Sequence, residues 1–359
     1  MKLHIVGGFL GSGKTTAIAA AARLLMAQGQ RVGIVTNDQG RYLVDTAFFQ
    51  ALNAPAVEVT GGCFCCNYDD LDARLSQLQA EAQPDVIFAE SVGSCADVVA
   101  TVIRPLLTLR HAPASLSVFA DARLLRLRLL GAALPFADDV VYIFDKQIEE
   151  AGLLVVNKAD LLPPAELDET LALARAAYPD KRIRPQRSLD ADSVAGWLAA
   201  LEQAAQPPDT ALEMDYARYG AGEAALAWLD LDLALDAPGA DGRAAAAALI
   251  GAAVAAARAG GFAVAHLKFL VRAGAQGVKV SVPALDDGAW AGQLPPLPGG
   301  ALTLLVNARV EAGADALRDT LLAALQAAAA EAGVALAVRR ADSFHPPQPV
   351  PTHRLPPAG

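Results

Sequence analysis

Three glycines, a lysine and a threonine stand at fixed spacing near the N-terminus. Residues 8–15 read GFLGSGKT and fit the pattern G-x-x-x-x-G-K-[ST] at every fixed position. An apolar run precedes them at 3–6, and a helical pattern follows from about Thr15 to Gln28. In that setting, backbone N–H groups converge on phosphate oxygens, and the helix N-terminus adds its partial positive charge. The stretch predicts a nucleotide phosphate site, with a plain glycine turn as the alternative.

The side chains of this loop have distinct expected roles. Lys14 should reach the β- and γ-phosphates and is one of the expected catalytic residues. The Thr15 hydroxyl should ligate Mg²⁺. The remaining residues expected to contact the nucleotide here are Gly8, Gly11, Ser12, Gly13 and Thr16.

A second motif indicates which base is bound. The segment 153–162, LLVVNKADLL, is an apolar strand that ends in Asn157, Lys158 and Asp160, the pattern N-K-x-D. The Asp160 carboxylate would accept hydrogen bonds from guanine N1–H and the 2-amino group, which adenine does not offer. Ser188 is a further candidate for a base contact, and an ordinary helix cap is equally compatible with it.

The expected Mg²⁺-binding acid lies between these motifs. The segment 84–93, PDVIFAESVG, is an apolar strand ending in Glu90, and Gly93 would approach the γ-phosphate. A capping glutamate is the alternative for Glu90. Another strand, 31–36, is followed by N-D-Q-G at 37–40, where Asp38 would face Mg²⁺ or its water, or simply belong to a turn. Glu90 and Asp38 are therefore expected to act in catalysis with Lys14.

Three of the four cysteines fall within four positions. Residues 60–68 read TGGCFCCNY and contain Cys63, Cys65 and Cys66. Clustered thiols without a secretion signal indicate a metal or redox site, and thiolates favour Zn²⁺, Co²⁺ or Cu(I). In an extended segment Cys63 and Cys65 would share a face, and Cys66 would join only if the backbone bends. A structural zinc site and a redox dithiol stay open as alternatives.

The fourth thiol, Cys95, follows the Glu90 strand in ESVGSCADV. It would add a further thiolate if its loop meets the cysteine loop. The metal site would then be tighter and exchange its ion less readily, which would argue against transfer of the ion. A buried small residue at a helix start is the plainer interpretation.

The pattern of strands and helices that must position these motifs predicts an α/β fold. Apolar segments at 3–6, 31–36, 85–89, 115–120 and 153–157 alternate with helical stretches, as in an open, mostly parallel sheet of P-loop NTPase type. A second, smaller α+β domain follows: a strand at 228–235, a helix at 243–258, a hairpin around 273–274, a strand at 302–310, a helix at 315–332 and a strand at 335–339. The expected boundaries are 1–205 for the GTPase domain, 206–222 for a linker, 223–344 for the second domain and 345–359 for a Pro-rich tail.

Composition narrows the partners. The 29 basic and 39 acidic residues give a net charge of −10, which argues against general nucleic-acid binding. We saw no membrane-spanning stretch and no signal peptide, so a cytoplasmic location is expected.

The motifs GFLGSGKTT, ESVG, GGCFCC and VNKAD together resemble the CobW-type GTPases, relatives of the nickel-site maturation GTPases HypB and UreG. The resemblance covers roughly residues 1–200 by motif, and AHLKFLV and SFHPPQPVPTHR are similar to parts of the CobW C-terminal domain. It implies a P-loop GTPase that carries metal on C-x-C-C. Asn37-Asp38-Gln39-Gly40 departs from the N-E-F-G of many members, and the five histidines are not clustered, which argues against bulk metal storage.

The resulting prediction is a GTP-hydrolysing metallochaperone that uses Mg²⁺ and carries Zn²⁺ or Co²⁺. It would transfer the ion to a client metalloprotein or a cofactor-synthesis enzyme, as in cobalamin biosynthesis. The alternative is a GTP-switched assembly factor for a corrinoid or metalloenzyme whose cysteine site is purely structural. The oligomeric state stays open, and a homodimer is compatible with the sequence.

Overall fold

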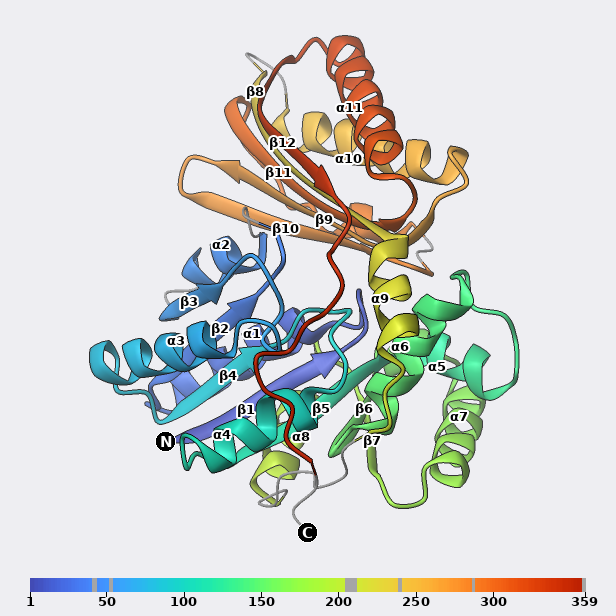
Figure 1. Ribbon diagram of the computed structural model, residues 1–359. Coiled ribbons are helices and arrows are strands. Elements are labelled where there is room, and N and C mark those ends of the chain that lie inside the picture. Colours follow the sequence, from blue (N-terminus) through green and yellow to red (C-terminus); the bar gives the residue numbers. More distant parts are fainter. Residues whose placement is uncertain (41–43, 52–53, 204–211, 238–240, 286–287, 357–359) are drawn as a thin grey trace. The chain divides into compact units, whose positions relative to one another are not determined.

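The chain is divided by its residue contacts into two units, both drawn in Figure 1. The computed structural model describes residues 1–359 apart from 41–43, 52–53, 204–211, 238–240, 286–287 and 357–359. The first unit contains 1–39, 52–222 and 348–359, and the second contains 40–51 and 223–347. Contiguous domains were expected from the sequence. The contacts instead assign 40–51 to the second unit and the last twelve residues to the first, and much of the expected linker lies outside the described residues.

The first unit is built on a seven-stranded sheet in which every pair of neighbours is parallel. The strand order is β3-β2-β4-β1-β5-β6-β7. This confirms the predicted α/β class with an open parallel sheet. The strands are β1 (Lys2–Gly8), β2 (Val32–Asn37), β3 (Ala56–Val59), β4 (Val86–Glu90), β5 (Ala114–Asp121), β6 (Leu153–Asn157) and β7 (Arg182–Gln186).

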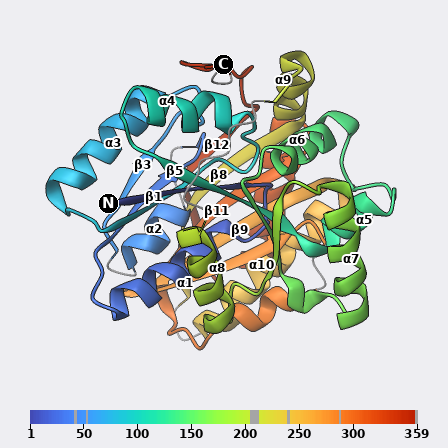
Figure 2. The same ribbon diagram turned by 90° about the horizontal axis from the view of Figure 1, so that it is seen from below.

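Helices cover both faces of this sheet. In Figure 2, α3, α4 and α6 lie on one face and α1 and α8 on the other, as right-handed crossovers require for this strand order. The helices are α1 (Lys14–Ala27), α3 (Tyr68–Glu81), α4 (Arg104–Thr108), α5 (Ala122–Leu129), α6 (Asp138–Glu149), α7 (Pro164–Ala177), α8 (Ala191–Gln203) and α9 (Tyr216–Ala225). Shorter turns of helix are η1 (Val99–Ile103) and η2 (Ala159–Leu161). Helix α9 begins in the first unit and ends in the second.

The strand order brings the sequence motifs to one edge of the sheet. Strand β1 is central, pairs with β4 and β5, and leads directly into the glycine loop. Val6 is in register with Glu90, and Asp121 is in register with Asn157. Because parallel strands have their carboxyl ends on the same side, all these strand-end residues meet at the edge where open α/β sheets bind ligands.

The second unit contains a five-stranded antiparallel sheet of order β10-β9-β11-β8-β12. The predicted alternating strand and the hairpin around 273–274 are both present. Its elements are α2 (Val44–Ala51), β8 (Leu226–Ala237), α10 (Gly242–Ala259), β9 (Ala263–Ala273), β10 (Gln276–Pro283), η3 (Ala289–Gln293), β11 (Gly300–Glu311), α11 (Ala314–Glu331) and β12 (Ala335–Phe344).

The core of this unit lies between one sheet face and helices α10 and α11. Side chains alternate along each strand, so Leu229, Leu231 and Leu233 of β8 share the core face with apolar residues of β9 and β11. Among the described residues, one helix, α10, is long and apolar enough to cross a membrane. We had expected no membrane-spanning stretch from the sequence. Helix α10 meets the length and hydropathy criterion because it is rich in alanine. Its buried residues recur at every turn, among them Ala246, Leu249 and Ala253, and pack into the core.

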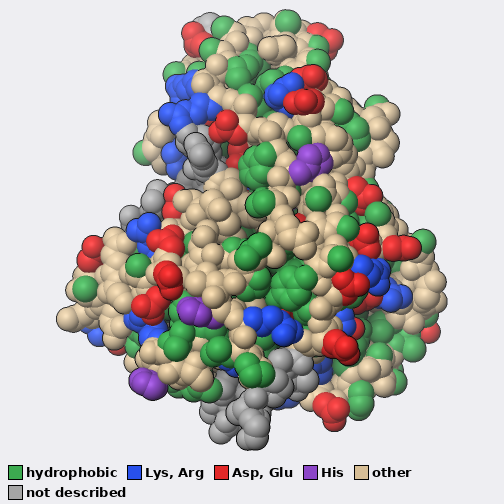
Figure 3. Space-filling model, viewed as in Figure 1, with side chains coloured by type: hydrophobic (Ala, Val, Ile, Leu, Met, Phe, Trp, Pro, Cys, Tyr) green, Lys and Arg blue, Asp and Glu red, His purple; other side chains and the backbone are tan. Residues whose placement is uncertain are grey.

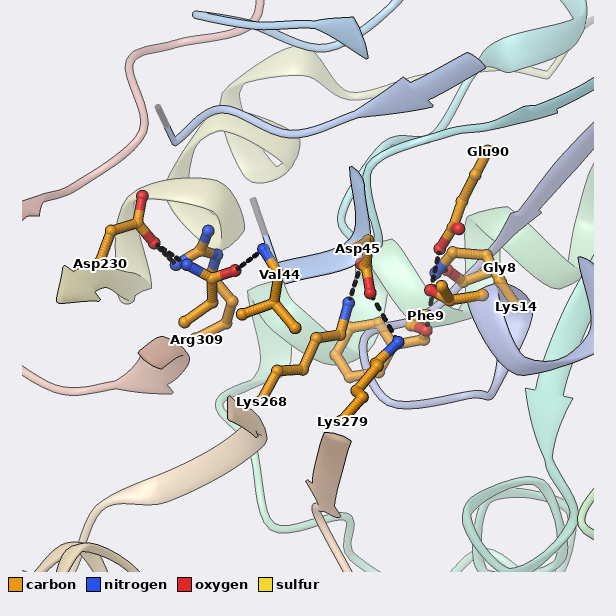
Figure 4. Close-up of polar contacts among 12 residues, drawn as sticks. Gly8, Phe9, Lys14, Val44, Asp45, Glu90, Asp230, Lys268, Lys279 and Arg309 are labelled. Atoms are coloured by element: carbon orange, nitrogen blue, oxygen red, sulfur yellow. Dashed lines mark hydrogen bonds and ion pairs between the residues drawn. The ribbon is translucent and has the colours of Figure 1, made fainter. Parts of the chain in front are cut away.

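The opposite face of the sheet carries charged and amide side chains, and α2 packs there. The Asp45 carboxylate forms ion pairs with Lys268 of β9 and, at 2.6 Å, with Lys279 of β10 (Figure 4). The Val44 N–H donates to Asn307 Oδ1 at 3.0 Å. Desolvation of this buried carboxylate is outweighed by the two ammonium groups, so the pKa of Asp45 lies far below its ordinary value.

A fully buried ion pair supports the same face. Arg309 donates to Asp230 at 2.8 Å, and its guanidinium stacks 3.8 Å from the centre of the Trp228 ring. Asn307 also donates to Asp230. A Cβ on Gly40 would collide with the Asp230 carboxylate, so the backbone at Gly40 lies directly against this pair. Elsewhere on the visible surface of each unit, acidic and basic side chains are both widely spread (Figure 3).

Candidate nucleotide and metal site

The glycine loop between β1 and α1 wraps around the Lys14 ammonium. Lys14 is buried and donates to the carbonyl oxygens of Gly8 and Phe9, at 2.6 and 3.2 Å (Figure 4). Gly8 has φ +124°, and a Cβ there would collide with the backbone of Phe119 on β5. Only glycine fits at that point. The loop therefore holds a buried cation at the N-terminus of a helix, an arrangement suited to a polyphosphate.

The two expected Mg²⁺ ligands are brought together. The Thr15 hydroxyl at the start of α1 donates to Glu90 Oε1 at the end of β4, at 2.8 Å. Both residues are buried. A hydroxyl and a carboxylate are hard oxygen donors of the kind that Mg²⁺ prefers, so this pair fits the ion.

Gly93, three residues beyond Glu90, packs against the glycine loop. A Cβ on Gly93 would stand 2.6 Å from Leu10 Cδ2 and 3.0 Å from Leu10 Cα. Its carbonyl oxygen accepts a 3.0 Å hydrogen bond from the buried Gln147 side chain of α6. The expected γ-phosphate contact is thus held on one side by the loop and on the other by α6.

The expected base-reading residues lie at the ends of β6 and β7. Asn157 donates to the Ser12 carbonyl oxygen at 2.7 Å and accepts from the Ser188 hydroxyl at 2.7 Å. Lys158 has φ +59° and donates to Asp121 Oδ2 at 3.0 Å. Its ammonium and Arg123 outweigh burial and hold the pKa of Asp121 below its ordinary value. Asp160 is exposed on η2, where its carboxylate is accessible to a base.

Asp121 contributes more than its sequence context suggested. It directly follows the expected strand segment 115–120, and its carboxylate pairs with the lysine of the N-K-x-D motif. Its position at a strand end in register with Asn157 was the available signal.

The cysteine segment forms a turn, which settles an open question from the sequence. The backbone N–H groups of Cys66 and Asn67 both donate to the Cys63 carbonyl at 3.0 Å, so the chain bends. The Sγ of Cys63 lies 2.7 Å from that of Cys65 and 3.4 Å from that of Cys66. All three sulfurs lie within 4.8 Å of one another. The backbone therefore brings Cys66 to the same side as the other two thiols.

Two of these thiols, Cys65 and Cys66, have raised pKa values in this arrangement. Hydrogen bonding to Cys63, together with burial, raises the pKa of Cys66 to about 11. The pKa of Cys65 is also raised, first by its contact with Cys63 and then by its other thiol neighbours and burial. A metal ion that binds here must displace protons, so metal affinity should rise with pH.

Asn37, which the sequence analysis assigned no role, connects the cysteine turn to β2. Its side-chain oxygen accepts from the Phe64 N–H at 2.8 Å, and its amide donates to the Gly62 carbonyl at 2.8 Å. The next residue, Asp38, is half-buried and donates its backbone N–H to Val59 at 3.3 Å. The Asn37 side chain therefore holds the cysteine turn, and the next residue along the chain is Asp38, which is expected to face Mg²⁺ or its water.

The C-terminal tail lies along the same turn. The Thr352 N–H donates to the Cys65 carbonyl and its hydroxyl donates to the Cys66 carbonyl, both at 2.9 Å. Arg354 then pairs with the buried Asp97 at 2.7 Å. Residues 350–354 thus form a strap over the cysteine turn, and the backbone of Val350 also hydrogen-bonds to Cys66.

Comparison with known proteins gives the same assignment for the first half of the chain. Residues 2–184 match the family model described as CobW/HypB/UreG, nucleotide-binding domain. The chain is 29% identical over 186 residues to a zinc chaperone CobW from Sinorhizobium sp, covering 45% of this chain and 52% of that protein. It is 31% identical over 201 residues to a urease accessory protein UreG from Streptomyces coelicolor, covering 53% and 78%.

A third relative is the zinc chaperone YeiR of Escherichia coli, 30% identical over 172 residues and covering 45% of this chain and 48% of that protein. The chain thus spans about half the length of the CobW and YeiR relatives. Among solved structures, the hydrogenase maturation factor HypB from Archaeoglobus fulgidus aligns at 19% identity and a TM-score of 0.40, covering 56% of this chain and 89% of that one.

Proposed function

Because the chain belongs to the family of CobW, HypB and UreG nucleotide-binding domains, we propose that it is a GTP-hydrolysing metallochaperone. In this proposal it binds Zn²⁺ or Co²⁺ through Cys63, Cys65 and Cys66 and couples hydrolysis to transfer of the ion. The observation that carries the proposal is the bent turn with three convergent thiols, attached through Asn37 to the strand that precedes Asp38. The recipient would be a cytoplasmic client metalloprotein or an enzyme of cofactor synthesis, including cobalamin synthesis.

Hydrolysis is assigned to the strand-end residues. Lys14 and the loop N–H groups of Gly11, Ser12 and Gly13 would bind the phosphates. Thr15 and Glu90 would hold Mg²⁺, which when bound neutralises charge on the β- and γ-phosphates. Glu90 and Asp38 would orient the attacking water. That water adds to the γ-phosphorus, the bond to the β-phosphate oxygen breaks, and GDP and phosphate result.

Guanine selection is assigned to Asp160, with Asn157, Lys158 and Ser188 forming its support. Asp160→Asn should weaken GTP binding by roughly 10- to 100-fold, because the guanine N1–H and 2-amino groups lose their charged acceptor. Isothermal titration with GTP and ATP measures this. Equal affinity of the unaltered chain for GTP and ATP would refute the guanine assignment.

The metal role is tested by competition with a chromogenic chelator. Zn²⁺ and then Co²⁺ affinities would be measured with GDP and with a non-hydrolysable GTP analogue, in the presence of Mg²⁺. A tenfold difference between the nucleotide states corresponds to about 1.4 kcal/mol of coupling and supports transfer. Equal affinity would contradict transfer.

The burial of Cys63 and Cys65, which are 3% and 1% exposed, favours a second candidate. In it the chain is a GTP-switched assembly factor for a corrinoid or metalloenzyme, and the cysteine site is structural. Cys65→Ser would then lower the melting temperature without abolishing client activation in cells. Under the metallochaperone proposal the same variant abolishes activation.

A further inference from the structure

The fourth cysteine lies against the thiol cluster. Cys95 is 1% exposed, and its Sγ lies 3.8 Å from the Sγ of Cys65. Cys65 is therefore at the centre of the group, with Cys63 and Cys66 on its own turn and Cys95 on the loop that follows β4. Among the four, Cys66 alone is half-exposed, so an ion would enter beside Cys66 and meet Cys95 last.

Bond lengths indicate whether four sulfurs at this spacing suit one ion. A tetrahedral zinc site with Zn–S bonds of about 2.3 Å has sulfur–sulfur edges of about 3.8 Å. The distances from Cys65 to Cys66 and to Cys95 are both 3.8 Å. The 2.7 Å between Cys63 and Cys65 is too short for such an edge and must open when an ion enters. Cys95 contacts the trio through Cys65. The sulfurs that lie within 4.8 Å of one another are those of Cys63, Cys65 and Cys66, so joint ligation requires Cys95 to come closer to the other two thiols.

The loop that carries Cys95 is the one that carries the expected γ-phosphate contact. The Cys95 N–H donates to the Val92 carbonyl at 3.0 Å, closing a tight turn across Gly93. Gln147 donates to the carbonyl oxygens of both Gly93 and Cys95, at 3.0 and 2.9 Å. One side chain of α6 therefore fixes both residues, and a displacement of Gly93 would carry Cys95 with it.

We propose that Cys95 is a fourth thiolate ligand of the carried ion, supplied by the loop that follows Glu90. Binding then replaces four S–H bonds by four metal–sulfur bonds and releases four protons to solvent. Movement of Gly93 with the nucleotide state would withdraw Cys95 and leave three ligands, the open coordination that a site needs for release. This inference deepens the proposed function and rests on it for the nucleotide link.

The test counts sulfur ligands. Zinc K-edge X-ray absorption of the unaltered chain gives the sulfur number directly, and Co²⁺ gives sulfur-to-metal charge-transfer absorption that scales with thiolate number. Cys95→Ser should lower that absorption by about a quarter and reduce the protons released per ion from four to three. Cys66→Ser is the matched comparison and should give the same loss. A melting curve of each variant shows that it is folded.

Three outcomes of these measurements would contradict the ligand role of Cys95, the metal role of the thiols and the link to Gly93, respectively. Unchanged absorption and proton release in Cys95→Ser, with three sulfurs in the unaltered chain, would make Cys95 a buried small residue and refute this inference alone. No thiolate absorption from the unaltered chain would refute the metal role itself. Four sulfurs in both the GDP and the analogue state would refute the route from Gly93 to Cys95, whereas a change from four to three supports it.

Discussion

The side-chain amide of Asn157 donates a 2.7 Å hydrogen bond to the Ser12 carbonyl oxygen. This bond connects the loop expected to read the base with the loop expected to hold the phosphates. The Ser188 hydroxyl donates to the oxygen of the same amide, which fixes the orientation of Asn157 from the other side. A Cβ on Gly13 would collide with the Asn157 amide, so the two loops are closely packed.

Replacing Asn157 should therefore weaken nucleotide binding. Asn157→Ala leaves the buried Ser12 carbonyl unpaired, a loss of about 1–3 kcal/mol, or roughly 5- to 150-fold in affinity. Fluorescence titration with labelled GDP measures it. Ser188→Ala is the control and should have a smaller effect, because it removes the orienting hydroxyl and retains the bond to Ser12. Equal affinities of Asn157→Ala and the unaltered chain would contradict this role.

The ion pairs of Asp45 should contribute strongly to the stability of the second unit. Asp45→Asn removes the charge that two largely buried lysines share, and we expect a loss of about 3 kcal/mol. Hydrogen–deuterium exchange of β9 and β10 amides reports the change locally. Asp85→Asn is the matched control: its pair with Arg31 is about half-exposed and screened by solvent, so its loss should leave the protection of these amides nearly unchanged.

The stabilisation by Asp45 and its two lysines should depend on pH in a defined way. The pKa of Asp45 is lowered in the folded chain, so its stabilisation is complete above the unfolded pKa near 3.8 and is lost as pH falls below that value. Protection of β9 and β10 should therefore decrease in acid, and Asp45→Asn should show a flatter response. A parallel response of the two proteins would show that other groups dominate.

The stability of the first unit should also depend on pH through His4, in a higher pH range than the one that affects Asp45. Burial lowers the pKa of His4 to about 4, and its Nδ1 lies 2.7 Å from the Ser115 hydroxyl. Between pH 6.5 and 4 the unfolded chain binds a proton that the folded chain does not. The free energy of unfolding should therefore fall as pH falls through this window, by about 1.4 kcal/mol per pH unit from this group.

Denaturant titrations from pH 4 to 8 measure that slope. His4→Gln should flatten it, because glutamine does not titrate. His111→Gln is the control at an exposed position and should leave the slope unchanged. A steep slope that persists in His4→Gln would assign the effect to buried carboxyl groups instead.

The strap should slow metal release. Thr352→Val removes the hydroxyl that donates to the Cys66 carbonyl, and the loss of about 1 kcal/mol should accelerate chelator removal of Co²⁺ by roughly fivefold. Thr352→Ser retains the hydroxyl and should release the ion at the original rate. Identical rates for all three chains would show that the strap does not control exit.

Patterns within short segments predicted much of the fold. Leu229, Leu231 and Leu233 alternate with charged or small residues, and the corresponding strand β8 is confirmed. The motifs at strand ends were expected to lie at one edge of the sheet, because parallel strands have their carboxyl ends on the same side. Strand β7 was not predicted: RIRPQ has no apolar run, and its position as an edge strand permits Pro185.

The remaining features depend on contacts that no local pattern encodes. The sequence around Asp45 contains no sign that its partners lie 223 and 234 residues later. Thr352 contacts a cysteine turn 286 residues earlier. The approach of Cys66 to the other thiols depends on a backbone turn within the motif, for which the sequence allowed both outcomes.

Residues 40–51 belong to the second unit and residues 348–359 to the first. This division has a consequence for synthesis on the ribosome. At about 5–20 residues per second, α2 emerges roughly 10 to 45 seconds before the lysines that pair with Asp45. The cysteine turn is likewise made long before Thr352, which lies 286 residues after Cys66 in the chain. A nascent chain therefore presents its thiols uncovered until residues 350–354 have been made.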